Sequence, residues 1–261
     1  MVKLIDCFIF YNELDMLEYR FKEIDDVIDY YVLVECTKTF ANNDKELFFE
    51  NNKNKFEKYL DKIIHIVVDK DIPNTNNAWD REWYQRNCID TGIQKLNLIN
   101  EDIVIISDVD EIPDIDTLLN IKNNKLEGIY CLEQDMYYYN LNCKGLNHKW
   151  YLPKILNFGS YNGKPETTRA NVQNVPIIKY GGWHLSYFGD IDFIQNKIKN
   201  FSHQEYNNDF ILNEQRIKEQ IINCSDLFGR DNKSKHNFTY IDINNNSYLP
   251  KKYKELLYKK I

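Results

Sequence analysis

The chain has 261 residues, of which 43% are hydrophobic and 28% are charged, a composition that excludes a disordered or fibrous protein. Its 40 Asp and Glu residues outnumber its 33 Lys and Arg residues, and the net charge of -7 opposes binding to the phosphate backbone of a nucleic acid. No linker rich in Pro, Gly or Ser divides the chain, so we expect one globular domain over residues 1–261.

The cysteine pattern and the hydropathy indicate the cellular compartment in which the protein resides. Six cysteines are scattered without a CxxC motif, which indicates reduced thiols rather than a zinc site or a disulfide framework. The apolar stretch at the N-terminus is interrupted by Asp6, and no run reaches the ~20 apolar residues that a membrane-spanning helix needs. We therefore expect a cytoplasmic protein without a signal peptide, anchor or transmembrane segment.

The first half of the chain alternates between strand and helix patterns. Short apolar or β-branched runs, typical of buried parallel strands, occupy residues 4–10, 30–35, 63–68 and 103–107. Helix patterns lie between them, at residues 14–24 and 78–98. This alternation predicts an α/β fold with a mostly parallel, Rossmann-like central sheet flanked by helices.

The second half has a different pattern. Residues 128–142 are aromatic and alternating, and residues 150–179 have the character of strands and turns. Two helices are predicted after them, at residues 191–202 and 213–223. Because no linker separates it from the first half, the second half is expected to continue the same domain.

The strand at residues 103–107 ends in two carboxylates, Asp108 and Asp110, separated by one residue. Ligands of open α/β sheets bind at the carboxyl ends of strands. A divalent cation that also holds a diphosphate needs hard oxygen ligands and open positions, so the pair predicts a Mn²⁺ or Mg²⁺ site. The alternative is a polar strand end at which one aspartate caps the next helix. The additional acid Glu111 and the turn residue Pro113 favour the metal.

Several motifs, in one order, resemble glycosyltransferase family 17, the group that contains the β-1,4-mannosyl-glycoprotein N-acetylglucosaminyltransferases. The motifs are FIFYNELDMLEYR near the N-terminus, RExxxRN from Arg81, DVDEIP from Asp108, GGWHLS from Gly181, FSHQEY from Phe201 and DLFGR from Asp226. The resemblance covers nearly the whole chain. It implies a GT-A type fold, a divalent metal, inversion at the anomeric carbon and a glycan acceptor. It also implies a nucleotide-sugar donor, which is UDP-N-acetylglucosamine in the animal members.

The resemblance also implies a division of the domain into two halves and separate roles for the residues of the metal site. About residues 1–135 form the half that binds the nucleotide sugar, and about residues 136–261 form the acceptor side. In the implied fold Asp110 is the direct metal ligand and Asp108 contacts the ribose or reaches the metal through water. His184 is a candidate for a further ligand of the metal or the diphosphate, and the alternative is a packed histidine. Trp183 is a candidate to stack on a sugar, and the alternative is a core tryptophan.

Residues that end the first two predicted strands are candidates for donor binding. Asn12 and Glu13 follow the first strand and Glu35 follows the second, so all three face the nucleotide from one sheet edge. The alternative role of Asn12 is a helix cap.

Arg81 and Arg86 are further candidates, for contact with the diphosphate. They are five residues apart, about 140° around a helix, so both point at one diphosphate only if the helix begins between them. Arg81, near the first turn, is favoured. Arg86 is also explained by an i,i+4 surface pair with Glu82.

An inverting transfer needs a base opposite the metal, which takes the proton of the acceptor hydroxyl. The candidates are Glu111 beside the metal pair, Asp135 after the strand at residues 128–134, and Glu205 in the segment HQE. The geometry disfavours Glu111 unless its side chain turns toward the acceptor, and the resemblance favours the segment of Glu205. Each is also explained as a solvated surface residue.

Two sequence features concern the acceptor. Aromatic residues follow the proposed donor site and offer stacking surfaces for a sugar, although sheet packing explains them equally well; they are Tyr137, Tyr138, Tyr139, Trp150 and Tyr151. The basic residues 251–260 predict a weak contact with an anionic membrane surface, and the alternative is a solvated terminal helix.

Two other functions agree with part of the sequence. A phosphatase of the haloacid-dehalogenase type also places a DxD motif after a strand, with Asp108 as its nucleophile, but Glu111 and Ile112 stand where that motif needs Thr or Val. A carbohydrate-binding protein without turnover is the other alternative. The prediction that we favour is a metal-dependent, inverting glycosyltransferase that moves N-acetylglucosamine from UDP-N-acetylglucosamine to a glycan hydroxyl.

Overall fold

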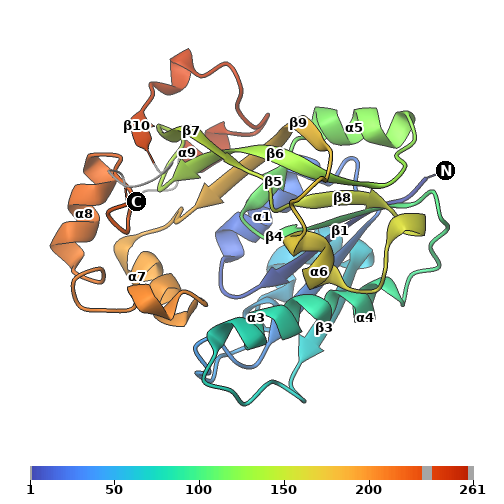
Figure 1. Ribbon diagram of the computed structural model, residues 1–261, viewed down its shortest axis with the longest axis horizontal. Helices are drawn as coiled ribbons and strands as arrows, with labels where there is room; N and C mark the ends of the chain where they lie inside the picture. The colour runs from blue at the N-terminus through green and yellow to red at the C-terminus, as the bar shows by residue number, and fades with distance from the viewer. Residues whose placement is uncertain (1, 231–236, 258–261) are drawn as a thin grey trace.

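The computed structural model describes residues 2–230 and 237–257. The first half of the chain builds four parallel strands in the spatial order β3-β2-β1-β4 (Figure 1). These strands are β1 (Leu4–Phe10), β2 (Tyr30–Cys36), β3 (Ile63–Val68) and β4 (Ile103–Asp108). Every residue of β1 is buried, because helices cover both faces of the sheet. The predicted strands and their parallel pairing are confirmed.

The second half of the chain extends this sheet with antiparallel pairs. β8 (Lys154–Asn157) lies between β4 and β6 (Ile129–Tyr138) and is antiparallel to both. β7 (Cys143–Trp150) and β10 (Phe238–Tyr240) continue the sheet at one edge. β9 (Ile177–Ser186) runs parallel to β6, and the short β5 (Glu111–Pro113) pairs with β9. The fold is therefore mixed α/β, with a mostly parallel first half.

Helices cover the two faces of the parallel half. One core contains Leu17 and Phe21 of α1 (Leu14–Ile24) and Leu118 of α5 (Ile115–Asn123), together with Phe8 of β1. The same core takes in α2 (Phe48–Asn51) and the 3-10 helix η1 (Lys53–Lys62). The other face is covered by α3 (Ala78–Asn87) and α4 (Ile89–Ile93).

The helix predicted over residues 78–98 is two helices, and it ends earlier than expected. A break at Cys88 separates α3 from α4, and α4 ends at Ile93. Gly92 allows α4 to approach β2 closely, because a Cβ at this position would lie 2.3 Å from Cγ1 of Val32. Propensity alone does not reveal such a packing requirement.

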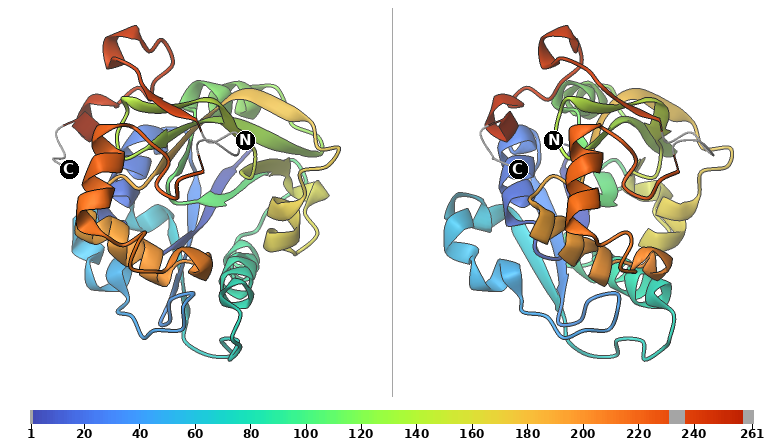
Figure 2. Two further views of the ribbon diagram at one scale, coloured as in Figure 1. Left: turned by 60° about the vertical axis from the view of Figure 1, so that its left-hand side comes forward. Right: turned by 90° about the vertical axis from the view of Figure 1, so that its left-hand side faces the viewer.

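The remaining helices form a smaller core beside β6. This core is formed with α7 (Ile191–Asn200), η3 (Gln204–Tyr206) and α8 (Glu214–Ile222), which lie together in Figure 2. Their apolar side chains pack against Met136 and Tyr138. The two helices predicted here are confirmed. The segment 150–179, predicted as strand and turn, also contains η2 (Phe158–Ser160) and α6 (Pro165–Ala170). The prediction missed this α-helix.

The end of the described chain contains η4 (Ile243–Asn245) and α9 (Lys254–Leu257) and packs against α1. The carboxylate of Glu23 accepts the backbone N–H groups of Lys251 and Lys252 at 2.7 and 2.8 Å. The Lys251 ammonium pairs with Asp116. Of the basic segment 251–260, the structure describes residues 251–257, so Lys259 and Lys260 lie outside the described residues.

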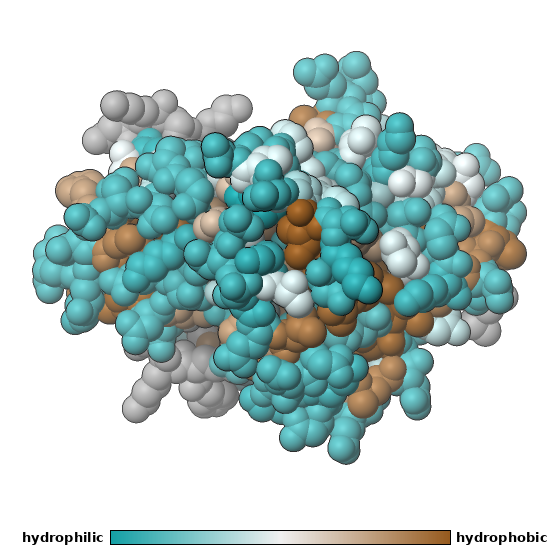
Figure 3. Space-filling view, turned by 90° about the horizontal axis from the view of Figure 1, so that it is seen from below, coloured by the Kyte–Doolittle hydropathy of each residue, from teal (hydrophilic) through white to brown (hydrophobic). Residues whose placement is uncertain are grey.

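Within the part of the chain that the structure describes, no helix has the length and apolar character to cross a membrane. On the face seen in Figure 3, hydrophobic side chains come to the surface in separate patches between hydrophilic ones. Membrane contact through the basic C-terminus stays a prediction.

Candidate active site

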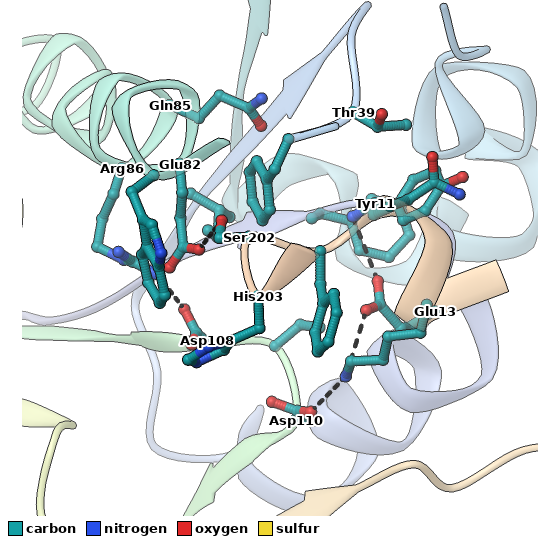
Figure 4. Close-up of a pocket in the computed structure, with 18 of the residues that line it drawn as sticks. Tyr11, Glu13, Thr39, Glu82, Gln85, Arg86, Asp108, Asp110, Ser202 and His203 are labelled. Atoms are coloured by element: carbon teal, nitrogen blue, oxygen red, sulfur yellow. Dashed lines mark hydrogen bonds and ion pairs between the residues drawn. The ribbon is translucent and has the colours of Figure 1, made fainter. Parts of the chain in front are cut away.

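A cavity of about 420 Å³ lies at the carboxyl ends of β1 and β4, between α3, α6 and α7 (Figure 4). The cavity wall combines five basic side chains with five carboxylates. The basic residues are Lys38, Lys45, Arg86, Arg169 and Lys197, and the acidic residues are Glu13, Glu82, Asp108, Asp110 and Glu166. This balance suits an anionic ligand that arrives with its own cation.

Asp108 ends β4 and is held by two buried arginines. Its Oδ1 lies 3.0 Å from Nη2 of Arg86, and its Oδ2 lies 2.6 Å from Nη2 of Arg169. Burial acts to raise the pKa of Asp108, but Arg169 and then Arg86 outweigh it and hold this pKa below its ordinary value. Asp108 is therefore an anion whose orientation is fixed by two guanidinium groups.

Arg86 reaches Asp108 from α3 and pairs with Glu82, at 2.7 Å, and with Glu166. The expected pair with Glu82 thus exists, but the side chain of Arg86 is only 3% exposed, so the expectation of a surface pair is wrong. Arg81 points elsewhere and donates to the backbone carbonyls of Phe40 and Thr75, both at 2.6 Å. Of these two arginines, Arg86 therefore lines the cavity, whereas Arg81, which was favoured, does not.

Asp110 faces a different cation. Its Oδ2 lies 2.8 Å from Nζ of Lys197, on α7, and its Oδ1 lies 3.6 Å from Nε2 of His184. Burial acts to raise the pKa of Asp110, but the Lys197 ammonium and His184 outweigh it and hold this pKa well below its ordinary value. Lys197 also lies 3.8 Å from Oε1 of Glu13, so its ammonium sits between two carboxylates.

The residues around Lys197 fit a hard divalent cation. The ammonium of Lys197 already lies beside Asp110, so a positive charge is stabilised at this position. His184 is buried, and within the described residues nothing bonds to its Nδ1. No ready-made group of three His, Cys, Asp or Glu ligands occurs among the described residues. Such a cation would therefore take part of its coordination from oxygens of the bound ligand.

Arg20 holds the turn that carries Asp108 and Asp110. Its fully buried guanidinium donates to the backbone carbonyls of Asp108, Val109 and Glu111 at 3.0, 3.2 and 2.8 Å. The same group forms two hydrogen bonds to the carboxylate of Asp6, at 2.6 and 2.7 Å. Sequence reasoning missed Arg20, because an arginine inside an amphipathic helix pattern is usually exposed.

The predicted bases do not line the cavity. Glu111 is fully buried and bonds to Arg169, to the indole N–H of Trp150 and to the backbone N–H of Asp108. It therefore supports the Asp108 turn from inside the protein.

The other two candidate bases also lie outside the cavity wall. Asp135 pairs with Lys144 and Lys149, and it lies inside β6 rather than after it, because that strand continues to Tyr138. Glu205 is exposed and lies 2.7 Å from Nδ1 of His203. His203 itself lines the cavity, so the FSHQEY segment reaches the site through a neighbour of Glu205.

Of the predicted donor contacts, Glu13 lines the cavity, whereas Asn12, Glu35 and Trp183 do not. Glu35 is fully buried and accepts the N–H groups of Phe49 and Glu50 at the start of α2. Trp183 is 1% exposed and packs on Tyr248, which agrees with the core alternative.

The N-cap position of α1 is Glu13, so Asn12 does not have the predicted role of a cap. Its backbone N–H donates to Oε2 of Glu13 at 3.1 Å. The segment that follows β1 therefore arranges Glu13 toward the cavity by local hydrogen bonds.

Arg169 and Lys197 were missed by sequence reasoning. Arg169 lies on α6, whose start carries a signal that was overlooked, a proline in the first turn followed by Glu166. Lys197 lies on the predicted helix α7, but helical periodicity does not show which lysine of a polar face meets Asp110.

The class of the protein, a glycosyltransferase, follows from comparison with known families. The family model described as glycosyltransferase family 17 matches residues 1–255, and the chain belongs to this family. The resemblance seen in the motifs is confirmed.

Relatives with an assigned name share part of the chain. The β-1,4-mannosyl-glycoprotein 4-β-N-acetylglucosaminyltransferases of Homo sapiens and Rattus norvegicus are each 32% identical over 116 residues, and that of Mus musculus is 31% identical over 116 residues. The match covers 42% of this chain and 22% of each relative, so it spans less than a quarter of their length. A solved structure, the inositol-1-phosphate CTP transferase from T. maritima, matches 72% of this chain and 90% of its own with 10% identity and a TM-score of 0.38.

Proposed function

We propose that this protein transfers N-acetylglucosamine from UDP-N-acetylglucosamine to a hydroxyl group of a glycan, with inversion at the anomeric carbon, on a fold of the GT-A type. Membership of glycosyltransferase family 17 and the printed names of the relatives support the reaction. The observation that carries the proposal is the presence of Asp108 and Asp110 in one cavity with Arg86, Arg169 and Lys197. Such a set binds a diphosphate and stabilises it as a leaving group.

A divalent cation, Mn²⁺ or Mg²⁺, belongs to the proposal. Asp110 and His184 would hold it, because the carboxylate of Asp110 adjoins the Lys197 ammonium and the buried imidazole of His184 lies 3.6 Å from that carboxylate. When bound, the cation neutralises the charge that develops on the diphosphate. Arg86 and Arg169 orient Asp108 beside it and add positive charge to the same wall.

The nucleoside would occupy the opposite end of the cavity. Tyr11 and Thr39, which follow β1 and β2, lie on the side of the cavity away from Asp108 (Figure 4). The ammonium of Lys45 lies 4.6 Å from the centre of the Tyr11 ring and holds that ring in place. An aromatic face and a hydroxyl group at this end suit a pyrimidine base and its ribose.

Glu13 is the carboxylate that we assign as the base. It lines the cavity, and its Oε2 is fixed by the backbone N–H groups of Tyr11 and Asn12 at 3.3 and 3.1 Å. In the transfer, the acceptor oxygen bonds to the anomeric carbon as the bond from that carbon to the diphosphate oxygen breaks. The electron pair leaves with the diphosphate, and the hydroxyl proton passes to the carboxylate.

Calorimetric titration of UDP, with and without Mn²⁺, tests this function before an acceptor is known. We expect binding that requires Mn²⁺ and that Asp110→Asn weakens by at least about tenfold, or about 1.4 kcal/mol. Asp209→Asn, which changes an exposed aspartate outside the cavity, is the matched control. With wild-type protein and Mn²⁺, release of UDP should be faster from UDP-N-acetylglucosamine than from UDP-glucose.

Three results would reject the proposal. Absence of UDP binding under every metal condition would remove the donor. If the wild-type protein releases phosphate from p-nitrophenyl phosphate and Asp108→Asn does not, the result would instead support the phosphatase alternative. Binding of UDP without turnover of any UDP-sugar would favour a protein that kept the fold and lost catalysis.

A further inference from the structure

Two tryptophans lie side by side on α3, at the edge of the candidate active site. Trp79 and Trp83 are four residues apart and therefore share one face of the helix, with their ring centres 6.5 Å apart. Trp79 is half-buried and lines the cavity of about 420 Å³. Trp83 is 43% exposed and lies outside the cavity wall. The pair therefore leads from the cavity to the outer surface.

His203 joins the two tryptophans from a distant segment of the chain. The centre of its ring lies 4.7 Å from that of Trp79, with the ring planes 86° apart. His203 lines the same cavity, and its side chain is 49% exposed. The hydroxyl group of Ser202 donates to Glu82 of α3, which connects this segment to the helix (Figure 4). We refer to Trp79, Trp83 and His203 as the aromatic cluster.

Packing inside the protein does not explain the two tryptophans. Neither Trp79 nor Trp83 belongs to the hydrophobic cores of the described residues. Within the same part of the chain, no hydrogen bond uses the indole N–H of either residue. Contact of a large aromatic ring with water is unfavourable, and an exposed pair with unused N–H donors is typical of a surface that a ligand covers.

A sugar ring is the kind of ligand that matches this surface. One face of the ring presents C–H groups that pack on an indole, and its edge presents hydroxyl groups that accept the indole N–H. The extent of the cluster distinguishes a glycan from a nucleotide. A nucleotide bound in the cavity reaches Trp79 but not Trp83, whereas a chain of sugar rings can leave the cavity and cover both.

The helix α3 also fixes the cluster relative to the candidate donor site. Arg86, on the same helix, pairs with Asp108 at 3.0 Å, and Trp79 shares the cavity wall with that pair. A helix holds binding residues more precisely than a loop does. We propose that the aromatic cluster binds the acceptor, a glycan of at least two sugar rings, with the reacting ring in the cavity beside Trp79 and a following ring on Trp83. The inference rests on the proposed function, because it names the acceptor of that transfer.

Binding to an array of immobilised monosaccharides and oligosaccharides, with UDP and Mn²⁺ present, tests the inference. We expect wild-type protein to bind oligosaccharides and Trp83→Ala to bind them about tenfold more weakly, whereas Trp83→Phe, which keeps an aromatic ring, retains most of the affinity. Tyr180→Ala is the matched control, because Tyr180 is an aromatic residue that is 65% exposed and lies outside the cavity and the cluster. With a bound oligosaccharide as substrate, Trp83→Ala should raise the KM for the acceptor about tenfold and leave the KM for the donor unchanged.

The inference is overturned if no immobilised oligosaccharide binds or if Trp83→Ala binds as tightly as wild type does. Calorimetry of UDP with the same variants keeps this failure apart from failure of the proposed function. Weaker UDP binding in Trp83→Ala would assign the cluster to the nucleotide and would also overturn the inference. If wild-type protein binds no UDP but Trp83→Ala still loses affinity for oligosaccharides, the proposed function fails and the glycan-binding surface stands. Circular dichroism checks that each variant folds, as expected for a substitution at an exposed position.

Discussion

The Asp108–Asp110 turn depends on Arg20, whose guanidinium bonds to three backbone carbonyls and to Asp6. Arg20→Met leaves the Asp6 carboxylate buried without its partner, so we expect the free energy of unfolding to fall by about 3–5 kcal/mol. Urea denaturation followed by tryptophan fluorescence measures it. Lys22→Met, on the same helix and 39% exposed, should change it by less than about 1 kcal/mol. Equal stability of the two variants would contradict the role of Arg20 in holding the Asp108–Asp110 turn.

The Lys197 ammonium lies beside Asp110, where we propose that a divalent cation binds. Lys197→Met removes a competing charge from Asp110, so we expect Mn²⁺ to bind about tenfold more tightly in the absence of nucleotide, equivalent to about 1.4 kcal/mol. Calorimetric titration with MnCl₂ measures this affinity. Lys199→Met, an exposed position on the same helix, is the control. Unchanged or weaker Mn²⁺ binding in Lys197→Met would show that the ammonium and the metal do not share this place.

The helix α6 is held in place by a buried lysine, Lys154. Nζ of Lys154 donates to the carbonyls of Tyr151, Leu152 and Arg169 at 3.0, 2.8 and 2.9 Å, which ties the end of α6 to the segment before β8. Burial lowers the pKa of Lys154 to about 8.

Lys154→Met leaves these buried carbonyls unpaired, and we expect a loss of about 3 kcal/mol in the free energy of unfolding, measured by urea denaturation at a pH below 8. UDP should also bind more weakly, because Arg169 loses its support. Lys164→Met, exposed just before α6, should match wild type in both measurements. A stable Lys154→Met variant with normal UDP affinity would show that α6 needs no such tie.

The elements also show what the sequence can and cannot predict. Strands β1, β2 and β4 were predicted closely because a strand buried on both faces is a continuous apolar run. The edge strand β3 is only partly buried, but its run of Ile and Val is typical of a strand. The place of β8, antiparallel between β4 and β6, was not predicted, because partners in a sheet are far apart in the sequence.

The candidate site was likewise predictable only where a local motif indicates it. The aspartate pair at the end of β4 was found from a local motif, and both aspartates line the cavity. Helical spacing shows that Arg81 and Arg86 diverge, but it does not show that Arg86 is the one that reaches Asp108 at the end of β4. Arg20, Arg169 and Lys197 reach the site from separate helices, so only tertiary structure brings them together.

Hydrogen bonds connect the end of the described chain to the first helix, α1. Glu23→Ala leaves the N–H groups of Lys251 and Lys252 without their acceptor, which costs about 2 kcal/mol and should lower Tm by about 4–8 °C. Differential scanning calorimetry measures it. Glu18→Ala, on the same helix with a side chain that is 44% exposed, should leave Tm within about 2 °C of wild type. A Tm for Glu23→Ala as high as that of Glu18→Ala would mean that this contact does not stabilise the protein.

The central place of β1 has a consequence for the order of assembly during synthesis. β1 pairs on one side with β2 and on the other with β4, which ends at Asp108. On the ribosome, the N-terminal strand therefore has an open edge until residue 108 has emerged, and this edge exposes backbone groups that chaperones or other chains can bind. Docking of β4 covers that edge of β1. The step that protects the nascent chain therefore also places Asp108 at the candidate active site.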